Sequence, residues 1–463
     1  MQFVGRRAEL DRLTSELGRS GDAGRILVVR GRRQVGKSTL LEQFRRQVDV
    51  PSVFFAAAAG ATPGEELRAF VDEVAGSTLE AAAVMGDARP ASWEAALRLL
   101  AASTTTPSVV VIDELPYLLR GDPGLEGVLQ RVWDRHLSRA PVLLVLIGSE
   151  TTVMELLTSH GHPLFGRAGE LRVDPLAPRD VAALLDLPAG DAIEATVVTG
   201  GLPRLAQEWR AGGAQRVEDF VAQQLQDATS PLVVLGERYL RAEFPTTVQA
   251  ERVLRAVGSG ATTFQRLSER TGLNQGSLHR SLQQLLESRL LAVDRPLSTA
   301  TTRLALYRVH DNYLRFWLRY VPRALDRVER GRGDEAAASV LRDWASWRGA
   351  AVEPLVARCL AGGPPVQGLP DARSVGRFWT RDHSVEVDLV LADAPSPPTQ
   401  PLALGTIKWR ERAPVGHRDV ASLAQARAVV PGAAEAVLFA VGRTPGPVPD
   451  GLARLVTADD LLR

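Results

Sequence analysis

Two lysines, Lys37 and Lys408, occur among the 55 lysines and arginines of the chain, and each lies in a pattern where a lysine has a chemical role. Lysine carries a compact point charge that can approach a phosphate or a metal-bound oxygen end-on, whereas arginine is a planar fork. A coding bias towards arginine, alanine and glycine would also make lysine scarce. Lys37 is therefore assigned a role from its motif, whereas Lys408 can equally be an ordinary surface lysine.

Residues 31–38, Gly-Arg-Arg-Gln-Val-Gly-Lys-Ser, form the most informative motif. The apolar segment 26–29 precedes it and a helical pattern follows, so that strand, glycine loop and helix stand in the required order. In such a loop backbone amides close around the α- and β-phosphates of a nucleotide, Lys37 reaches the β- and γ-phosphate oxygens, and the Ser38 hydroxyl ligates Mg²⁺. The alternative, a chance glycine turn, would not explain why the flanking strand and helix, the spacing of the glycines and the Lys-Ser pair all occur together. The nucleotide-binding residues that we expect here are Gly31, Arg32, Arg33, Gln34, Val35, Gly36, Lys37, Ser38 and Thr39.

The segment 108–112, Ser-Val-Val-Val-Ile, leads directly into Asp113 and Glu114. Such an apolar run indicates a buried parallel strand that delivers two carboxylates to the carboxyl edge of a sheet. The pattern alone is common, but behind a phosphate loop it is typical of a Walker B segment. Asp113 would then hold the Mg²⁺ shell, and Glu114 would polarise the water that attacks the γ-phosphate.

A third apolar strand, residues 142–147, ends in Gly-Ser-Glu and places Ser149 at the same edge. Ser149 can sense the γ-phosphate or the attacking water, or it can cap the helix that residues 151–157 indicate, and the two roles are compatible. Arg167, in Pro-Leu-Phe-Gly-Arg, is a candidate arginine finger. In so arginine-rich a chain, a structural salt bridge is the alternative for Arg167.

Residues 175–230 have a helical pattern that is interrupted by the turn Gly-Gly-Leu-Pro-Arg at 200–204. This pattern suits a small helical lid over the nucleotide, from which Arg204 can reach the γ-phosphate. The alternative is that Gly-Gly-Leu-Pro is only a helix-breaking turn.

Residues 248–308 contain three short amphipathic stretches followed by a predicted hairpin, which is the element order of a winged helix-turn-helix. Asn274 is expected to cap the third helix. On the face opposite the leucines of that helix lie Ser277, Arg280 and Gln284, which can reach base edges or phosphates of double-stranded DNA.

The predicted hairpin carries Arg295, Arg303 and Arg308, which can line a basic wing. Winged helices also serve as protein-interaction or spacer modules, and Glu287 on the same face as the candidate DNA contacts weakens the electrostatic attraction. DNA binding and protein binding therefore both remain open for this segment.

Beyond Trp347 we expect a helix that bears Glu353, strands near 375–380, 384–391 and 402–409, and a helix near 419–429. With Asp388 on one strand and Lys408 on the next, this order resembles the PD-(D/E)xK nuclease fold, in which two carboxylates hold a divalent metal and a lysine lies beside the activated water. Thr406 stands where the second acid belongs, and a hydroxyl is a poor metal ligand. Glu353, or Glu386 on the neighbouring strand, can compensate, but we favour an inactive relative that is kept for binding or packing.

The composition is that of an ordinary globular chain of 463 residues, 45% of them hydrophobic. A formal net charge of +1 gives no global attraction to a polyanion, so any nucleic-acid contact must come from a local patch. The single cysteine, Cys359, cannot form an internal disulfide. The N-terminus has no signal-peptide pattern, and the apolar run 142–147 is too short to cross a bilayer. We expect a cytoplasmic protein without a membrane partner.

As a whole, the motifs resemble archaeal-type P-loop ATPases of the broad AAA+/STAND group, which end in a nuclease-like domain. The resemblance rests on Phe-Val-Gly-Arg-Arg-Ala-Glu-Leu from Phe3, on the phosphate loop, Val-Ile-Asp-Glu, Gly-Ser-Glu, Leu-Phe-Gly-Arg and Gly-Gly-Leu-Pro-Arg, and on the tail around Asp388 and Lys408. It implies ATP and Mg²⁺ as cofactors, a lid, a winged helix, and contacts of Phe3 to Arg6 with the adenine. The roles of Arg167 and Arg204 are carried over by position.

The fold class that we predict is α/β: a P-loop NTPase parallel-sheet core with a helical lid, a winged helix-turn-helix, and a C-terminal α/β restriction-endonuclease-like domain. The predicted boundaries are 1–174 for the core, 175–240 for the lid, 241–310 for the winged helix, 311–345 for a helical linker and 346–463 for the nuclease-like domain.

The predicted function is an ATPase that hydrolyses slowly and acts as a switch, coupling nucleotide state to DNA or to a partner protein, with a homo-oligomer as a further expectation. An ATP-licensed DNA nuclease is the alternative. A third alternative is a DNA-binding regulator whose nucleotide site is only structural.

Overall fold

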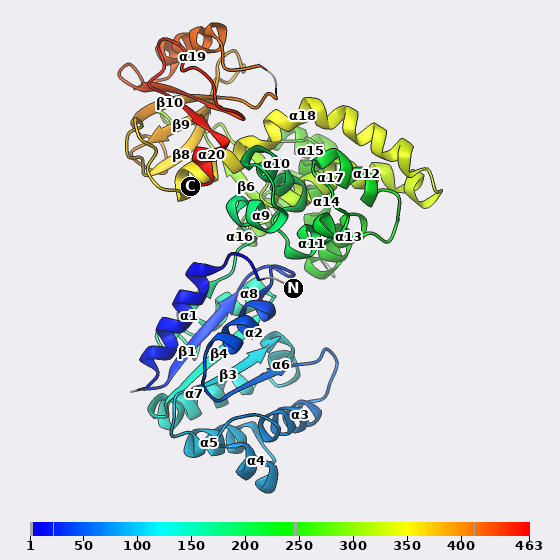
Figure 1. Ribbon diagram of the computed structural model, residues 1–463, viewed down its shortest axis with the longest axis vertical. Coiled ribbons are helices and arrows are strands. Elements are labelled where there is room, and N and C mark those ends of the chain that lie inside the picture. Colours follow the sequence, from blue (N-terminus) through cyan, green and yellow to red (C-terminus); the bar gives the residue numbers. More distant parts are fainter. Residues whose placement is uncertain (1–2, 22, 245–247, 412) are drawn as a thin grey trace. The chain divides into compact units, whose positions relative to one another are not determined.

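The computed structural model describes residues 3–21, 23–244, 248–411 and 413–463, which divide into two compact units, Met1–Pro175 and Leu176–Arg463 (Figure 1). The predicted boundary at residue 174 lies next to this division. Met1 and Gln2, the first residues of the N-terminus in which we expect no signal peptide, lie outside the described residues. Each unit is considered by itself.

The N-terminal unit alternates strands and helices. In chain order its elements are α1 (Arg7–Arg19), β1 (Arg25–Arg30), α2 (Lys37–Gln47), β2 (Ser52–Ala56), α3 (Pro63–Ala75), α4 (Ala82–Ala88), α5 (Trp93–Ser103), β3 (Ser108–Asp113), α6 (Leu115–Gly121), α7 (Leu125–Arg135), the short 3-10 helix η1 (Leu137–Arg139), β4 (Val142–Gly148), α8 (Thr151–Leu157) and β5 (Ala168–Arg172).

These five strands form one parallel sheet in the order β2-β3-β4-β1-β5. All residues of β3 and β4 are buried, which explains their nearly uninterrupted apolar sequences. Because β4 lies between β1 and β3, the carboxyl ends of these three strands meet side by side at one edge. In open parallel sheets this edge is where ligands bind.

Helices cover both faces of the sheet. Alternate strand residues such as Val28, Val110 and Leu144 join one apolar cluster with residues of α3 to α8. Helices α1 and α2 contact the same sheet with buried residues such as Leu13 and Phe44 that lie outside this cluster, so they cover the opposite face. The side-chain period of two along each strand therefore builds a three-layer unit.

The C-terminal unit begins with helices and ends with a second sheet. Its elements are α9 (Pro178–Leu185), α10 (Ala189–Thr199), α11 (Pro203–Ala211), α12 (Val217–Gln224), α13 (Pro231–Glu243), α14 (Val248–Gly258), α15 (Phe264–Thr271), α16 (Gln275–Glu287), β6 (Leu291–Asp294), β7 (Leu306–Val309), α17 (Asn312–Glu329), α18 (Gly333–Gly362), β8 (Ser374–Trp379), β9 (Glu386–Ala392), β10 (Pro401–Lys408), α19 (His417–Val429), β11 (Val437–Gly442), β12 (Arg454–Thr457) and α20 (Ala458–Leu461).

Helix α10 is the centre of the helical part. Nine of its eleven residues are buried, and it packs against α9, α17 and α18. It ends at Gly200, whose φ of 66° is left-handed and whose added Cβ would lie 2.6 Å from the Cβ of Tyr313. An added Cβ at Gly201 would lie 2.2 Å from the carbonyl oxygen of Leu176. The Gly-Gly pair is thus required by close packing as well as by the turn.

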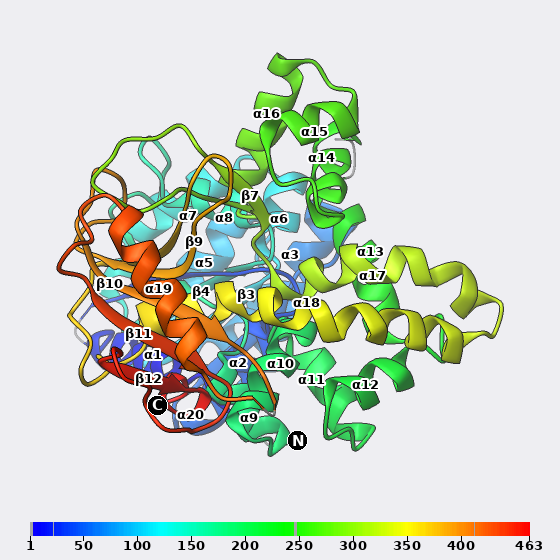
Figure 2. The same cartoon turned by 90° about the horizontal axis from the view of Figure 1, so that it is seen from above.

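Helices α14, α15 and α16 pack together and are followed by the antiparallel hairpin β6-β7 (Figure 2). This is the element order expected of a winged helix-turn-helix. The Asn274 side chain accepts a hydrogen bond of 2.9 Å from the backbone amide of Ser277, so Asn274 caps α16 as predicted. Gly272, with a φ of 64°, closes α15 and allows the sharp turn before α16.

The second sheet has the order β12-β11-β10-β9-β8, antiparallel from β8 to β10 and parallel from β10 to β12. Its three predicted strands and the helix near 419–429 are all present as β8, β9, β10 and α19. The predicted boundary at 345/346 between linker and C-terminal domain falls inside α18, which is one helix of 30 residues. Glu353 therefore lies on the same helix as the predicted linker.

None of the helices in the described part of the chain is both long enough and apolar enough to cross a bilayer.

Candidate functional site: a phosphate loop at the carboxyl edge of the parallel sheet

The loop between β1 and α2 passes close to the end of β5. An added Cβ at Gly31 would lie 2.3 Å from the carbonyl oxygen of Val173, so glycine is required there. Gln34 and Gly36 have left-handed φ values of 66° and 91°, and Gly36 immediately precedes the first turn of α2. This backbone turns successive amides towards the helix N-terminus, which is the arrangement that binds phosphate.

The Lys37 ammonium is buried within this loop. Its Nζ donates hydrogen bonds to the carbonyl oxygens of Gly31 at 2.8 Å and Arg32 at 3.0 Å, and to Ser149 Oγ at 3.0 Å. Burial lowers the pKa of Lys37 to about 8, although the carboxylates of Glu114 and Asp113 favour the charged form. The loop therefore holds the ammonium in place, and a phosphate oxygen would exchange with one of its three acceptors.

Ser38 and Asp113 meet at the first turn of α2. The Ser38 hydroxyl donates to Asp113 Oδ2 at 2.5 Å, and the Glu114 amide donates to Asp113 Oδ1 at 2.8 Å. A hydroxyl and a carboxylate are the oxygen ligands that Mg²⁺ takes alongside phosphates and water, so these residues fit the ion. Ser38 and Asp113 are the residues that would hold it.

Ser149 connects the phosphate loop to the Walker B segment. Its hydroxyl accepts from Lys37 and donates to Glu114 Oε1 at 3.1 Å. The geometry follows from strand order, because Ser149 comes directly after β4, which lies between the strands that precede Lys37 and Glu114. In helix α8 the first residue is Thr151, and Glu150 rather than Ser149 occupies the capping position. The alternative role of Ser149 as the cap is therefore not found.

Arg6 is a residue of this site that we did not predict in its role. It is buried, has a left-handed φ of 62°, and donates to the carbonyl oxygen of Val35 in the phosphate loop at 2.7 Å. It also donates to the carbonyl oxygen of Asp174. Its sequence signal was the Val-Gly-Arg-Arg motif, to which we assigned adenine contact. In the structure, the Arg6 guanidinium instead stabilises the backbone of the phosphate loop through its hydrogen bond to the Val35 carbonyl oxygen.

An ion-pair cluster at the same edge was also missed. Glu150 pairs with Arg120 at 2.5 Å and lies 3.8 Å from the guanidinium of Arg33. Burial works against the charge of Arg33, but Tyr117, Glu114 and Glu150 together raise its pKa. The side chain of Arg33 thus lies within electrostatic range of Glu114. The spacing of single charged residues in the sequence gives no signal for such a cluster.

The two predicted arginines of the hydrolysis machinery have structural partners. Arg167 forms a bidentate pair with Asp134, at 2.7 Å and 3.0 Å, and donates to the carbonyl oxygen of Pro163. This is the salt bridge that we gave as the alternative to a finger. Arg204, in the C-terminal unit, pairs with Glu208 one helical turn away, and its side chain is 58% exposed. Their roles towards ATP remain predictions.

The predicted DNA-contact residues lie on the outer face of α16. Arg280 and Gln284 are exposed and Ser277 is half-buried, whereas Leu278, Leu282 and Leu285 face the interior. The amphipathic pattern of the sequence therefore placed this face correctly.

The connection between β6 and β7, which we predicted as a basic wing, packs against the C-terminal sheet domain. Leu297, in the connection between β6 and β7, is buried in the core of the C-terminal sheet domain, and its amide donates to the carbonyl oxygen of Arg377 at 2.9 Å. The carbonyl oxygen of Ser298 accepts from the Thr399 amide at 2.9 Å. The Arg308 Nε donates to both carboxylate oxygens of Asp294 on the facing strand, each at 3.1 Å. The hairpin connection is therefore part of the neighbouring domain's core.

The possible nuclease remnant is partly assembled. The Thr406 hydroxyl and the Ile407 amide donate to Asp388 Oδ2 at 3.0 Å and 2.8 Å. Burial and the charge of Asp388 raise the pKa of Glu353 to about 7, so these two carboxyls are electrostatic neighbours. Lys408 ends β10 and is half-buried. Among the described residues, no group of three or more acidic, histidine or cysteine side chains is arranged to hold a metal ion.

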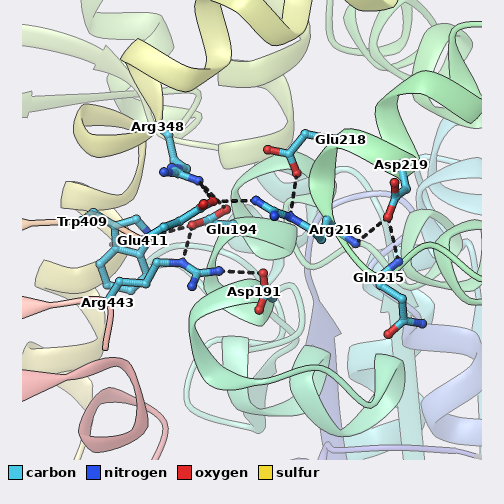
Figure 3. A network of polar contacts seen from close by, with 10 residues as sticks. All are labelled: Asp191, Glu194, Gln215, Arg216, Glu218, Asp219, Arg348, Trp409, Glu411 and Arg443. Atoms are coloured by element: carbon cyan, nitrogen blue, oxygen red, sulfur yellow. Dashed lines mark hydrogen bonds and ion pairs between the residues drawn. The ribbon is translucent and has the colours of Figure 1, made fainter. Parts of the chain in front are cut away.

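A buried polar network joins helix α10 to the C-terminal sheet domain (Figure 3). Glu194 of α10 is 3% exposed at its side chain and accepts at 2.9 Å both from Trp409 Nε1 and from Arg443 Nε. Arg443 also pairs with Asp191 at 2.7 Å. Burial raises the pKa of Glu194 against the opposing effect of Arg348, Arg443 and Trp409. Trp409 directly follows Lys408, the last residue of β10, so α10 contacts the chain at the end of that strand.

The same network extends through Glu411. This carboxylate lies 2.6 Å from Arg348 of α18 and 2.5 Å from Arg216, which precedes α12 (Figure 3). The arginines hold the pKa of Glu411 below its usual value despite partial burial. Helices α10, α12 and α18 and the sheet domain are therefore tied together by charges within one unit.

Two family models match parts of the chain. Residues 3–207 match the family model described as an ATPase domain predominantly from Archaea. Residues 317–421 match a second model, described as archaeal and bacterial proteins of unknown function. The N-terminal part of the chain is therefore similar to an ATPase domain, and part of the C-terminal unit is similar to proteins of unknown function.

Three similarities extend over most of the chain. An uncharacterized protein of Methanocaldococcus jannaschii, MJECL04, is 23% identical over 393 residues, which is 84% of each protein. The solved structure of the Walker-type ATPase PABY2304 of Pyrococcus abyssi is similar with a TM-score of 0.50 and 18% identity, over 68% of this chain and 96% of that one. The ORC2 protein of Aeropyrum pernix is less similar, with a TM-score of 0.45 and 14% identity over 73% and 96% of the two chains. The likeness to PABY2304 supports the α/β fold with a parallel-sheet core.

Proposed function

We propose that this protein is an ATP-dependent switch that binds ATP with Mg²⁺, hydrolyses it slowly, and couples its nucleotide state to duplex DNA or a partner protein. The observation that carries the proposal is the chain of contacts from Lys37 through Ser149 to Glu114, beside the Ser38–Asp113 pair. These are the groups that bind a triphosphate and orient the attacking water, within one cluster at the sheet edge.

Each residue has a distinct part in this chemistry. Lys37 and the amides of the loop bind the β- and γ-phosphates, and Ser38 and Asp113 would hold Mg²⁺, which neutralises phosphate charge when bound. Glu114 orients the water and accepts its proton. Ser149, hydrogen-bonded to both Lys37 and Glu114, responds to whether a γ-phosphate has taken one of the Lys37 contacts.

Slow hydrolysis is expected because both candidate finger arginines are held by carboxylates. Arg167 is paired with Asp134 and Arg204 with Glu208. An arginine that reaches the γ-phosphate can raise the hydrolysis rate by about 10³- to 10⁵-fold. A change that releases one of these arginines, or a partner chain that supplies one, would then control how long the ATP state lasts.

The coupling path that we propose runs along α10. This helix carries the Gly-Gly turn that leads into Arg204, and it is fastened to the sheet domain through Glu194. A buried helix transmits displacement as a rigid body, because its side chains are close-packed on all sides. A lid movement that follows the nucleotide would therefore carry the sheet domain with it. The winged helix, whose hairpin connection is embedded in that domain, would follow.

Isothermal titration calorimetry with Mg²⁺-ATP tests the nucleotide site. We expect Lys37→Ala to weaken ATP binding by about 10- to 100-fold, since the variant lacks a charged hydrogen bond to phosphate. Lys408→Ala, at the chain's other lysine, is the matched control and should bind as the wild type does. Equal affinity of the Lys37→Ala variant and the wild type would refute the proposal.

A second experiment tests the switch. Duplex-DNA affinity of the Glu114→Gln variant is measured with ATP and with ADP. Different affinities in the two nucleotide states support coupling to DNA. Equal, measurable affinities would leave an ATPase whose winged helix is not under nucleotide control.

The ATP-licensed nuclease is retained as the second candidate because Glu353 and Asp388 are electrostatic neighbours. Against it stand Thr406, which occupies the place of the second acid, and the hydrogen bonds that already satisfy Asp388 Oδ2. In a cleavage assay with Mg²⁺ or Mn²⁺, the nuclease requires Lys408→Ala to abolish cutting. We expect no cleavage that depends on Lys408.

A further inference from the structure

A pocket of about 330 Å³ lies between α14, α15 and α17. Four arginines line it: Arg252 and Arg255 from α14, Arg270 from α15 and Arg323 from α17. The floor is partly apolar and includes Leu318, which is 5% exposed. The volume falls at the lower end of the range for ligand sites, and the lining contains no acidic residue.

One of the four arginines is fixed by carboxylates. Arg255 pairs with Glu251 at 2.7 Å and Glu237 at 2.9 Å, and its guanidinium lies 5.8 Å from the ring centroid of Trp317. These contacts neutralise Arg255 and hold it as part of the wall. Arg255 therefore shapes the wall of the pocket and adds little net positive charge to it.

The other three arginines carry unneutralised charge. Among the residues that the structure describes, Arg252, Arg270 and Arg323 have no side-chain hydrogen bond or ion pair, and all three are exposed. Arg323 lies within electrostatic range of Asp343, but that carboxylate already accepts from Arg319 and Tyr320. In a chain with a formal net charge of only +1, three unpaired guanidiniums around one pocket make a local anion site.

The pocket opens beside the turn that leads into α16. Arg270 is in the last turn of α15, and Thr271, which follows it, lines the pocket. An Arg252 guanidinium nitrogen lies 3.8 Å from where a Cβ would stand at Gly272. Two of the charges thus flank the turn whose next helix exposes Arg280 and Gln284. In helix-turn-helix proteins, contacts to backbone phosphates fix the position of the helix that reads the bases.

The embedded hairpin gives this pocket additional weight. The connection after β6 is packed into the sheet domain and Arg308 is paired with Asp294, which leaves Arg295 and Arg303 as the exposed arginines of the expected wing. Phosphate contacts supply a large share of the affinity of a helix-turn-helix for DNA. The three unpaired arginines around the pocket are positioned to add such contacts next to the turn before α16.

We propose that the pocket between α14, α15 and α17 is a phosphate site for the backbone of duplex DNA, with Arg252, Arg270 and Arg323 as its ligands. The inference rests on the proposed function only in taking duplex DNA as the partner of α16. The proposed contact is an interaction between arginine guanidiniums and DNA phosphates, which does not depend on the base sequence. Removing it should weaken binding to all duplexes alike.

The test is the salt dependence of duplex binding by the full-length protein, measured by fluorescence anisotropy on a mixed-sequence duplex. We expect the triple variant Arg252→Ala, Arg270→Ala, Arg323→Ala to reduce the slope of log K against log salt by about three, roughly one for each phosphate that is no longer bound. The single variant Arg270→Gln should reduce it by about one. Circular dichroism and Lys37-dependent ATP binding confirm that the variants are folded.

Arg210→Ala is the matched control. Arg210 is an exposed arginine of α11 that does not line the pocket, so its removal should leave the slope unchanged. Wild-type binding with an unaltered slope in the triple variant would overturn the phosphate site while leaving the ATP switch intact. Absence of duplex binding by the wild type would overturn both the phosphate site and the DNA part of the proposed function, whereas the ATP-binding test would stand.

Discussion

The Ser149 hydroxyl donates a hydrogen bond to Glu114 Oε1 at 3.1 Å, which links the end of β4 to the carboxylate that follows β3. The same hydroxyl accepts from Lys37, so three polar groups that follow three adjacent strands, β1, β4 and β3, form one hydrogen-bonded chain. Glu114 has a left-handed φ of 52°, held by its position directly before α6. The carboxylate is thus oriented by the backbone and by Ser149 together.

Replacing Glu114 by Gln should stop hydrolysis while keeping ATP bound. Glutamine retains the shape and the contact with Ser149 but cannot accept a proton from water, and general-base catalysis contributes about 10²- to 10⁴-fold. We expect a rate reduction in that range with an ATP affinity within a few-fold of the wild type, measured by phosphate release and calorimetry. Glu94→Gln, at a glutamate of α5 that pairs with Arg131, is the control and should hydrolyse normally. Wild-type turnover in the Glu114 variant would assign the base elsewhere.

Binding of ATP should take up protons near pH 8. Burial lowers the pKa of Lys37 to about 8, so about half of the side chains are neutral at that pH. A bound phosphate favours the ammonium form of Lys37 and raises its pKa. ATP binding at pH 8 therefore makes Lys37 take up about half a proton from solution, whereas at pH 6.5 or below the side chain is already protonated and takes up almost none. Calorimetry in buffers of different ionisation enthalpy measures the uptake. An ATP affinity that does not fall as the pH rises above 8 would contradict the assignment.

Removing Glu194 should destabilise the C-terminal unit. The variant Glu194→Ala leaves Arg443 and the Trp409 indole without their shared buried acceptor, and breaking a buried ion pair costs about 3–5 kcal/mol. Urea unfolding followed by tryptophan fluorescence measures the change. Asp326→Ala removes an exposed pair with Arg330 and should have little effect. An unchanged urea midpoint for Glu194→Ala would show that the network does not hold the unit together.

The stability of the protein should fall as the pH rises from about 5 to about 7, in part through Glu353. The folded-state pKa of about 7 lies above the ordinary value of 4.5, so the folded protein binds the proton more tightly in this window, and deprotonation costs stability. Glu353→Gln should remove this dependence and stabilise the protein at pH 8 by about 1–3 kcal/mol. Denaturant midpoints at pH 5.5 and pH 8 give the comparison. A Gln variant with the wild-type pH profile would contradict it.

The local sequence was sufficient to predict the helices, strands and turns that carry the motifs. The strand, loop and helix order around residues 31–38, the strands predicted at 108–112 and 142–147 and the cap at Asn274 are confirmed, because backbone geometry and side-chain periodicity act over a few residues. The strands and helix of the C-terminal domain follow for the same reason. The outer face of α16 was likewise set by its leucine spacing.

The contacts of each residue in the site depend on the order of the strands in the sheet. A local sequence pattern does not specify this order. Insertion of β4 between β1 and β3 makes Ser149 a link to Glu114 instead of a helix cap. The hairpin expected to be a basic wing is packed into another domain through Leu297, an apolar residue whose surroundings periodicity cannot identify.

By itself, then, the sequence determined the secondary structure, the phosphate loop and the chemical types of the residues at the sheet edge, since these depend on neighbours along the chain. Only the tertiary structure decided that Glu353 lies near Asp388, that three unpaired arginines surround one pocket, and that Glu194 of α10 bonds to the sheet domain. The ion pair of Asp191 with Arg443 spans 252 residues. Contacts over such separations are fixed by packing and desolvation in three dimensions, which leave no periodic trace in the sequence.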